Sequence, residues 1–239
     1  MPEIPLVLFD RGAVRLNEKA YGVLEELIVT GALPPGSQWS EVALAEKIGL
    51  GRTPTREALQ RLAYERLVRI EPRQGVFISE VDYQGQLKII QSRRQIEQLV
   101  VADAAECAND AERESLREVA RSLNELKSAK DIRTYLRLHF TLTCLLAAAS
   151  RNPYAAEFYS MLQTHARRFM NLHQDGYTDF AALCDLHIRQ IEAVVAGDVS
   201  AAKASAIERN DYAEAFARKI LMKLIESSGV TVRLAPRIA

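Results

Sequence analysis

The stretch Gly51-Arg52-Thr53-Pro54-Thr55-Arg56-Glu57-Ala58-Leu59-Gln60-Arg61-Leu62 predicts a helix around which the rest of the chain is organised. Gly51 or Thr53 is suited to cap it, and Pro54 is tolerated in the first turn because the N–H groups there have no helical partners. Apolar residues recur at helical spacing and predict a buried back, made of Ala58, Leu59, Leu62 and Ala63.

The front of this helix is basic and polar. Arg52, Arg56 and Gln60 lie one turn apart and share a face, and Thr53 lies in the first turn. Thr and Arg near a helix start can bind phosphate, and Arg and Gln can reach base edges in the major groove. The pattern therefore favours a helix that enters the DNA major groove.

The chain of 239 residues has no overall positive charge, because 31 Lys and Arg residues balance 31 Asp and Glu residues. With 48% hydrophobic and 26% charged residues it has the composition of a soluble globular protein. Nucleic-acid binding must then depend on a local patch. A basic patch does run from Lys47 to Arg73, although a solvated helix with pairs such as Glu57–Arg61 would also explain it.

Cysteines and the N-terminus indicate the compartment. Cys107, Cys144 and Cys184 form no zinc-binding or disulfide pattern and favour buried, reduced thiols. The apolar run Ile4–Phe9 is too short for a signal peptide or a membrane span. We therefore expect a cytoplasmic protein that does not contact a membrane.

Short elements surround the basic helix in the order of a winged helix-turn-helix. Helices are predicted over Asn17–Thr30 and Glu41–Ile48. The β-like runs Leu67–Ile70 and Val76–Ile78 predict a hairpin, or wing. The tip of this wing is expected to hold Arg73, Gln74 and Gly75.

Beyond residue 86 the chain is predicted to be helical almost to its end. The expected helices are Leu87–Cys107, Ala111–Lys127, Asp131–Ser150, Pro153–His173, Phe180–Ala196 and Ser200–Ser227, with Val230–Val232 in a tail. We predict a mainly α protein with an N-terminal winged helix-turn-helix domain and an all-α helical-bundle effector domain. The expected parts are a flexible arm (1–15), a winged-helix DNA-binding domain (16–80), a linker (81–86), an all-helical ligand-binding and dimerisation domain (87–228) and a tail (229–239).

Leu33-Pro34-Pro35-Gly36, the run Arg52-Thr53-Pro54-Thr55-Arg56-Glu57-Ala58-Leu59 and the Gly75 wing resemble the winged-helix domain of the GntR family of bacterial transcription regulators. The resemblance implies DNA contacts from Arg52, Thr53 and Arg56. It also implies contacts with the minor groove or phosphates from the wing residues Arg73, Gln74 and Gly75. Proteins of this type dimerise, so it further implies a homodimer on a palindromic operator in double-stranded DNA.

The helical remainder resembles the FCD-type ligand-binding domain of the FadR subgroup, in Arg93 before Ile96-Glu97, Asn152-Pro153 and His187 before Gly197-Asp198. Many such domains hold a divalent metal through an Asp and three His, and the metal holds a small carboxylate. Here most expected ligands are replaced. Thr143 stands at a usual His position, and Arg209 or Asn210 stands at the last one.

Three interpretations of these residues stay open. His139 and His187 could hold Zn, Ni or Mn with help from effector or water. Alternatively the metal site is lost, and His139, Thr143, His187 and Asn210 hydrogen-bond a small organic acid or sugar acid directly. In the third, they are satisfied polar groups of a helical core.

Two arginines are further candidates for binding an anionic effector. Arg93 could bind a carboxylate bidentately, although an i,i+4 pair with Glu97 would also account for it. Arg168 lies on a predicted helix and could either line the pocket or face solvent.

The leading hypothesis is a dimeric transcription regulator, expected to be a repressor, whose operator affinity is controlled by a small carboxylate effector. An alternative is a winged-helix DNA-binding protein with an effector-free helical domain. An enzyme built on Cys144, His139 and His187 is disfavoured because Cys144 lies off the helical face of His139.

Overall fold

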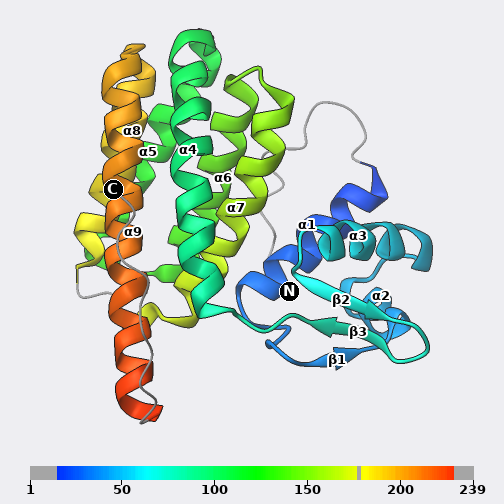
Figure 1. Ribbon diagram of the computed structural model, residues 1–239. Coiled ribbons are helices and arrows are strands. Elements are labelled where there is room, and N and C mark those ends of the chain that lie inside the picture. Colours follow the sequence, from blue (N-terminus) through cyan, green and yellow to red (C-terminus); the bar gives the residue numbers. More distant parts are fainter. Residues whose placement is uncertain (1–14, 177–178, 229–239) are drawn as a thin grey trace.

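The computed structural model describes residues 15–176 and 179–228, which form a small α/β part and a larger all-helical part (Figure 1). This confirms the predicted fold class. The expected arm, apart from Arg15, and the expected tail with Val230–Val232 lie outside the described residues. Among the residues that are described, no helix is long and apolar enough to cross a membrane.

The α/β part is a winged helix. It contains the helices α1 (Leu16–Val29), α2 (Glu41–Ile48) and α3 (Arg52–Tyr64), and an antiparallel sheet in the order β1 (Gln38–Trp39), β3 (Gly75–Ile78), β2 (Val68–Glu71). The predicted back of α3 is buried in the core through Ala58, Leu59 and Leu62. Gly51 is the N-cap of α3, so Thr53 lies inside the first turn and does not cap it.

Strand β1 is not predicted from the sequence, because a strand of two residues is too short to show an alternation of apolar and polar side chains. It pairs with β3 through Gln38↔Phe77 and Trp39↔Val76. At the start of β3, Gly75 has a φ of +106°, and a Cβ there would lie 2.5 Å from the carbonyl oxygen of Trp39. Gly75 is therefore needed for β1 to approach the wing, whether or not it contacts DNA.

We expect Gly75→Ala to lower the free energy of unfolding by about 2–3 kcal/mol, because strained backbone and steric overlap add. Gly49→Ala is the matched control: Gly49 also has a positive φ, +67°, but a Cβ there would meet nothing within 4 Å. This control should lose only about 1 kcal/mol. Urea denaturation of both variants measures the difference, and equal losses would refute the role given to Trp39.

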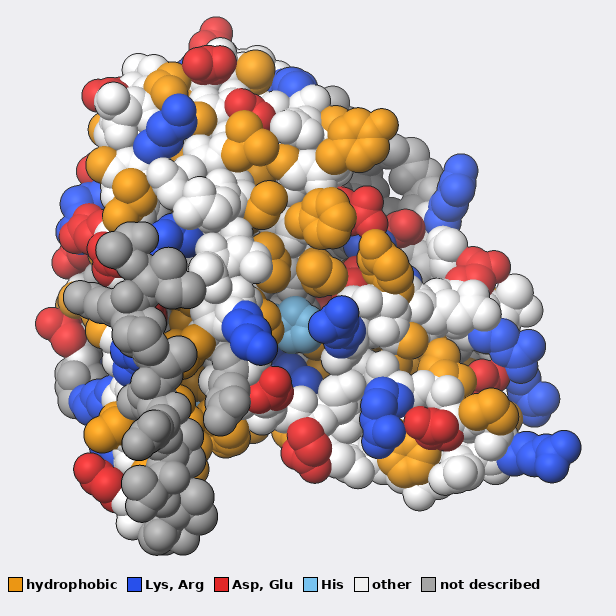
Figure 2. All heavy atoms as spheres, viewed as in Figure 1, with side chains coloured by type: hydrophobic (Ala, Val, Ile, Leu, Met, Phe, Trp, Pro, Cys, Tyr) orange, Lys and Arg blue, Asp and Glu red, His pale blue; other side chains and the backbone are white. Residues whose placement is uncertain are grey.

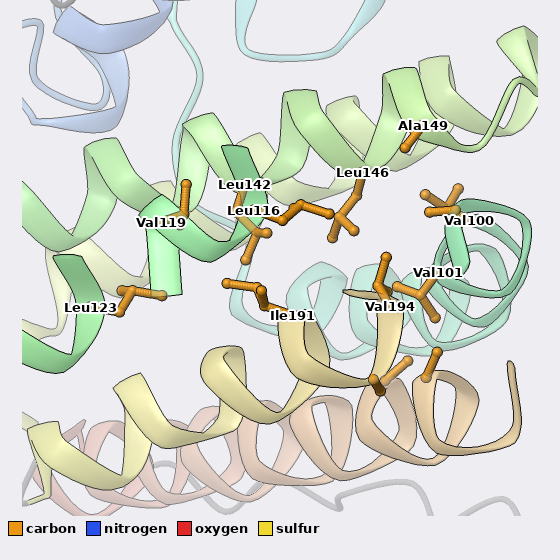
Figure 3. Packing of buried hydrophobic residues seen from close by; sticks show 14 of the residues in the cluster. Val100, Val101, Leu116, Val119, Leu123, Leu142, Leu146, Ala149, Ile191 and Val194 are labelled. Atoms are coloured by element: carbon orange, nitrogen blue, oxygen red, sulfur yellow. The ribbon is translucent and has the colours of Figure 1, made fainter. Parts of the chain in front are cut away.

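The helical part contains α4 (Tyr83–Cys107), α5 (Asp110–Ala129), α6 (Ile132–Ala149), α7 (Pro153–Leu172), α8 (Phe180–Ala196) and α9 (Val199–Ser228), with a 3₁₀ turn at Gln174–Gly176. All six predicted helices are present. Their apolar faces meet in one core, where Val100 of α4, Leu116 of α5, Leu146 of α6 and Val194 of α8 are each completely buried (Figure 3). This core holds the helices that surround the pocket described below.

The expected linker over residues 81–86 needs correction, because α4 begins at Tyr83 and includes most of it. The polar composition of this segment favours a loop, but packing extends the helix. The Tyr83 ring lies edge-on to Phe169 of α7 with ring centroids 6.1 Å apart, and Val81, Tyr83 and Leu87 pack on a small cluster with Phe169 and Phe216. Only a few residues after β3 therefore connect the two parts.

Candidate DNA-binding face and effector pocket

The front of α3 is open to solvent. Arg52, Thr53, Arg56 and Gln60 are all exposed, whereas Thr55 on the back is buried and its hydroxyl donates to the Gly51 carbonyl at 2.8 Å. Figure 2 shows Lys and Arg side chains at the end of the winged helix where α3 begins and the β2–β3 turn lies. The predicted recognition residues thus form an accessible surface.

Arg56 is already oriented by a neighbour. Its Nε and Nη2 groups donate to one carboxylate oxygen of Glu41, in α2, at 3.0 and 2.9 Å. The Arg56 side chain nevertheless remains 63% exposed, and exposed ion pairs contribute little free energy. A phosphate or base edge can therefore replace Glu41 at low cost.

Arg61 has a structural role. It pairs with Glu65 at 3.0 Å and with Glu18 at 3.4 Å, and it stacks on the Tyr21 ring at 3.8 Å. The alternative pair Glu57–Arg61 is thus replaced by contacts that fasten α3 to α1. Part of the basic patch serves packing between helices, which leaves the front of α3 as its accessible portion.

The wing presents Arg73 and Gln74, both exposed, while Gly75 is half-buried. Arg73 has a φ of +64°, a conformation favoured in tight turns. The Gln74 carbonyl accepts a 2.7 Å hydrogen bond from Gln38, so β1 holds the turn in place. The wing tip is therefore an ordered turn with two accessible polar side chains.

A pocket lies among α4, α6, α7, α8 and α9, with a cavity of about 40 Å³. This is room for a few water molecules or the head of a small acid. Its polar lining comprises Gln86, Arg93, His139, His187, Arg209 and Tyr212, and its apolar lining comprises Ala166, Phe169, Met170, Leu183, Leu186, Ala213 and Phe216. Three of the predicted effector residues, Arg93, His139 and His187, are therefore brought together.

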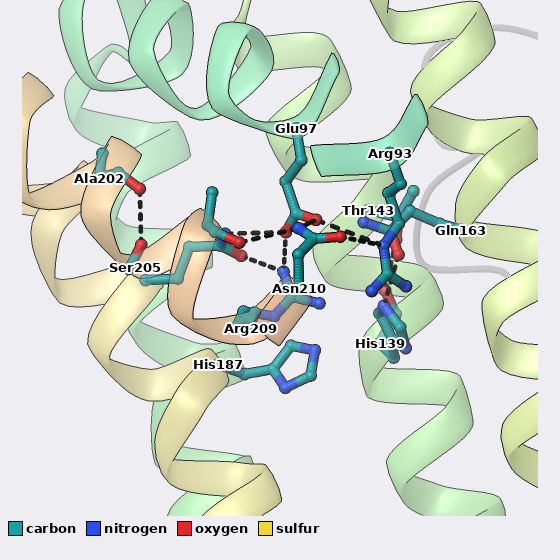
Figure 4. A network of polar contacts seen from close by, with 12 residues as sticks. Arg93, Glu97, His139, Thr143, Gln163, His187, Ala202, Ser205, Arg209 and Asn210 are labelled. Atoms are coloured by element: carbon teal, nitrogen blue, oxygen red, sulfur yellow. Dashed lines mark hydrogen bonds and ion pairs between the residues drawn. The ribbon is translucent and has the colours of Figure 1, made fainter. Parts of the chain in front are cut away.

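Beside the pocket, Glu97 is completely buried at the centre of a polar network (Figure 4). It forms an ion pair with Arg209, and it accepts hydrogen bonds from Gln190 at 3.0 Å and Asn210 at 2.9 Å. Arg93 lies 3.7 Å away and donates to Asn210 at 2.9 Å, so the predicted Arg93–Glu97 pair is present. Burial opposes ionisation of Glu97, but the two guanidinium groups hold its pKa below the usual value.

His139 and His187 face each other with ring centroids 4.8 Å apart. Burial, followed by the positive charge of nearby groups including Arg209, places the pKa of each well below the usual 6.5. Both rings are therefore neutral at pH 7. His187 Nδ1 donates to the Leu183 carbonyl at 3.1 Å and lies 3.0 Å from the Tyr135 hydroxyl, which fixes the ring.

The other predicted effector residues do not line the pocket surface in the described part of the chain. Thr143 donates to the His139 carbonyl at 2.8 Å, and Asn210 is engaged with Glu97. The sequence leaves open whether Arg168 lines the pocket or faces solvent. It is instead buried and donates to the Ser79 carbonyl, at the exit of the winged helix.

The histidine pair fits a metal ion poorly. Within residues 15–176 and 179–228 no group of three or more His, Cys, Asp or Glu side chains could hold one. Asn210, which stands at the last of the usual ligand positions, is held by Glu97. The same positive charge of Arg209 and Arg93 that lowers the pKa of the histidines disfavours a divalent cation between them.

Because His139 and His187 are neutral when folded, we expect the folded protein to lose stability in acid. Because the folded-state pKa of His139 and of His187 lies below the unfolded value, the unfolded chain takes up protons first as the pH falls. The free energy of unfolding should therefore decrease below about pH 6.5, by up to about 1.4 kcal/mol per pH unit for each buried histidine. Urea denaturation at pH 7.5, 6.0 and 5.0 measures this slope, which should be shallower in His139→Gln/His187→Gln. A constant free energy of unfolding across this range would contradict it.

The winged helix is fastened to α7 by a buried ion pair. Glu25 of α1 is 2% exposed, pairs with Arg167 and accepts a 2.8 Å hydrogen bond from the Thr164 hydroxyl. The Arg167 guanidinium also lies over the Phe140 ring of α6, 4.8 Å from its centroid. A charge buried as deeply as that of Glu25 is strongly destabilising when its counter-ion is removed.

Two further contacts from α7 reach the winged helix. His165 Nε2 donates to the carbonyl of Glu65, the C-cap residue of α3, at 2.8 Å, and Arg168 donates to the Ser79 carbonyl. The opposite side of α7 belongs to the pocket. There Phe169 and Met170 line the cavity, and Gln163 accepts a 3.2 Å hydrogen bond from His139. One helix thus contacts both the pocket and the end of α3.

Cys144 is not a nucleophile in this setting. Burial raises the pKa of its thiol to about 11, so it stays protonated at neutral pH. This agrees with the sequence argument against an enzyme.

Sequence reasoning missed Arg209 and Gln163 as site residues. Arg209 follows Ala202, Ser205 and Ala206 on one buried stripe of α9, and a charged residue on such a stripe is a recognisable signal. Gln163 gave no signal of its own, because its partner His139 comes from another helix.

The structure combines a winged helix that has an open basic face with a helical domain that has a buried polar pocket. This is the architecture of a DNA-binding protein with a second, helical domain. Residues 16–78 match the gntR family of bacterial regulatory proteins, and residues 88–210 match the FCD domain. The chain belongs to the GntR family and carries a C-terminal FCD domain, so it is a DNA-binding transcriptional regulator with an effector-binding domain and not an enzyme.

Individual relatives of the chain are also HTH-type transcriptional regulators. The chain is 42% identical over 59 residues to an uncharacterized HTH-type transcriptional regulator in the TAR-I ttuE-ttuC' intergenic region of Agrobacterium vitis, which is 25% of this chain and 34% of that protein. It is 27% identical over 149 residues to the HTH-type transcriptional regulator McbR of Escherichia coli, 62% of this chain and 67% of McbR. The structure of E. coli McbR/YncC matches with a TM-score of 0.74 at 20% identity, over 87% of this chain and 100% of that one, which shows a shared fold.

Proposed function

We propose that this chain is a homodimeric repressor of the FadR subgroup that acts in the cytoplasm, binds a palindromic operator and is released from it by a small organic acid. The observation that carries the proposal is α7, which lines the pocket with Phe169 and Met170 and holds the winged helix through Arg167. An acid that moves α7 would change how firmly α3 is held. A differential affinity of about 1–3 kcal/mol between the two arrangements is enough for control.

DNA recognition would divide between two elements. Arg52, Thr53, Arg56 and Gln60 are exposed on the front of α3 and are the groups proposed to enter the major groove. Arg73 and Gln74 would contact the minor groove or phosphates from the wing, with Gly75 shaping the turn.

An exposed apolar surface supports the homodimer. Figure 2 shows hydrophobic side chains gathered over α4 and α7. Leu99 of α4 is 43% exposed, and Tyr154 and Phe158 of α7 are 80% and 47% exposed. Large apolar groups at this density are typical of protein interfaces. Pairing through this surface would place two winged helices on one palindrome.

The dimer is tested by analytical ultracentrifugation. Wild type should sediment as a dimer at micromolar concentration, and Leu99→Glu/Phe158→Glu should be a folded monomer. Ile207→Glu is the control, because Ile207 is 39% exposed but lies on α9 and not on α4 or α7. A monomeric wild type, or a double variant that stays dimeric, would count against the proposed interface.

The regulatory function is tested in two steps. Selection from a random duplex pool should yield a palindromic site, and that site should repress a reporter gene in cells that express the chain. A thermal-shift panel of organic and sugar acids then identifies stabilising acids. Relief of repression by such an acid supports the proposal, whereas a reporter unaffected by any acid would favour an effector-free regulator.

A further inference from the structure

His139, which lines the pocket, has a buried hydrogen-bonding atom without a partner. His139 Nε2 lies 3.2 Å from the Gln163 side-chain oxygen, which can only accept, so the proton of the neutral ring is on Nε2. Nδ1 of His139 is then a lone-pair acceptor, and it is buried with no hydrogen-bond partner. A buried acceptor left unsatisfied costs free energy, which a ligand hydroxyl could recover.

His187 has the matching orientation. Its Nδ1 donates to the Leu183 carbonyl at 3.1 Å, so Nε2 is the acceptor of the neutral ring, with the Tyr135 hydroxyl 3.4 Å away. The two facing rings therefore present acceptors and not donors. A carboxylate, which also only accepts, would be repelled there, so it must bind elsewhere in the pocket.

The charged groups supply that place. Arg93 and Arg209 line the pocket, and both form ion pairs with the single carboxylate of Glu97. With both histidines neutral, the formal charge of these described groups is positive by one. Figure 4 shows the Arg93 guanidinium directed toward His139, so an anion on the guanidinium would lie beside the imidazole acceptor. One negative charge balances this site, and two would not.

Apart from Gln86 and Tyr212, the remaining lining is apolar, with Phe169, Met170 and Phe216 among its members. These side chains offer no partner to the several hydroxyl groups of a sugar acid. They suit a short alkyl body.

We propose, building on the proposed function, that the pocket binds a small hydroxy monocarboxylate. Its carboxylate pairs with Arg93 and Arg209, its hydroxyl donates to Nδ1 of His139, and its alkyl body packs on Phe169 and Met170. No metal ion takes part.

Calorimetric titration of the full chain tests this with three acids that differ by one group. In the presence of EDTA, 2-hydroxybutyrate should bind one per chain. Butyrate, which lacks the hydroxyl, should bind about tenfold or more weakly because the acceptor stays unpaired. Malate, which adds a second carboxylate, should also bind at least about tenfold more weakly. Equal affinity for the first two acids, or tightest binding of malate, would overturn the proposal.

A variant separates recognition from folding. His139→Phe removes the acceptor but keeps a ring, and it should bind butyrate and 2-hydroxybutyrate about equally, with a circular dichroism spectrum like wild type. Retained discrimination in this variant would overturn the role of His139. If the variant does not fold, the comparison of the three acids on wild type still decides.

The proposed function does not require the hydroxy-acid proposal to be correct. Binding of 2-hydroxybutyrate that is lost in EDTA, or no binding of any of the three acids, overturns the hydroxy-acid proposal. If another acid from the thermal-shift panel then relieves repression, the effector-controlled repressor still stands.

Discussion

Arg52→Ala/Arg56→Ala should reduce binding of the selected operator to the level of random duplex DNA while leaving the fold intact. Both side chains are exposed at the start of α3, and neither contributes to the core. Arg contacts with bases are worth about 1–3 kcal/mol each. Loss of both should therefore weaken specific binding by at least about a hundredfold, measured by gel-shift titration at fixed salt.

The matched control is Arg121→Ala. Arg121 is 60% exposed, close to the 63% of Arg56, and likewise pairs with a glutamate, but it lies on α5 far along the chain from the winged helix. Its removal should leave operator affinity within about twofold, as expected for a distant charge. An unchanged affinity in Arg52→Ala/Arg56→Ala would mean that α3 is not the recognition helix.

Arg167→Met should cause the largest loss of stability, about 3–5 kcal/mol, because it leaves Glu25 buried without its counter-ion. The double variant Glu25→Leu/Arg167→Met removes both charges and should recover much of this loss. Urea denaturation measures both. The double variant should also uncouple the two parts, so that an acid bound in the pocket no longer changes operator affinity.

Arg137→Met is the control for this pair. Arg137 joins the same two parts by pairing with Glu26 at 3.1 Å, but the two side chains are 40% and 27% exposed. Its loss should cost less than about 1 kcal/mol. Similar losses in Arg137→Met and Arg167→Met would show that burial does not set the strength of these contacts.

Local patterns predicted most of the fold. The apolar spacing of α3, the Gly and Pro positions around α2 and the β-like runs of the wing are signals carried by neighbouring residues, and each element is present. Strand β1 and the first turn of α4 were missed because packing creates them. Trp39 pairs with Val76 far along the chain, and Tyr83 becomes helical by packing on Phe169.

The site was predictable only in part, for the same reason. Arg93, His139 and His187 stand out as polar residues on apolar helices, and they do meet in the pocket. Arg168 is likewise a polar residue on a largely apolar helix, but it donates to the backbone carbonyl of Ser79. No sequence pattern predicts that partner. Which face of α7 turns to the pocket and which to the winged helix follows from tertiary packing alone.

The most direct measurement of effector control is the dissociation constant of the full chain for its selected operator, with and without an acid that calorimetry has shown to bind in the pocket. Fluorescence anisotropy at constant salt should show a change of about 5- to 150-fold at saturating acid. An operator affinity that is unchanged when the pocket is saturated would contradict control of α3 through α7.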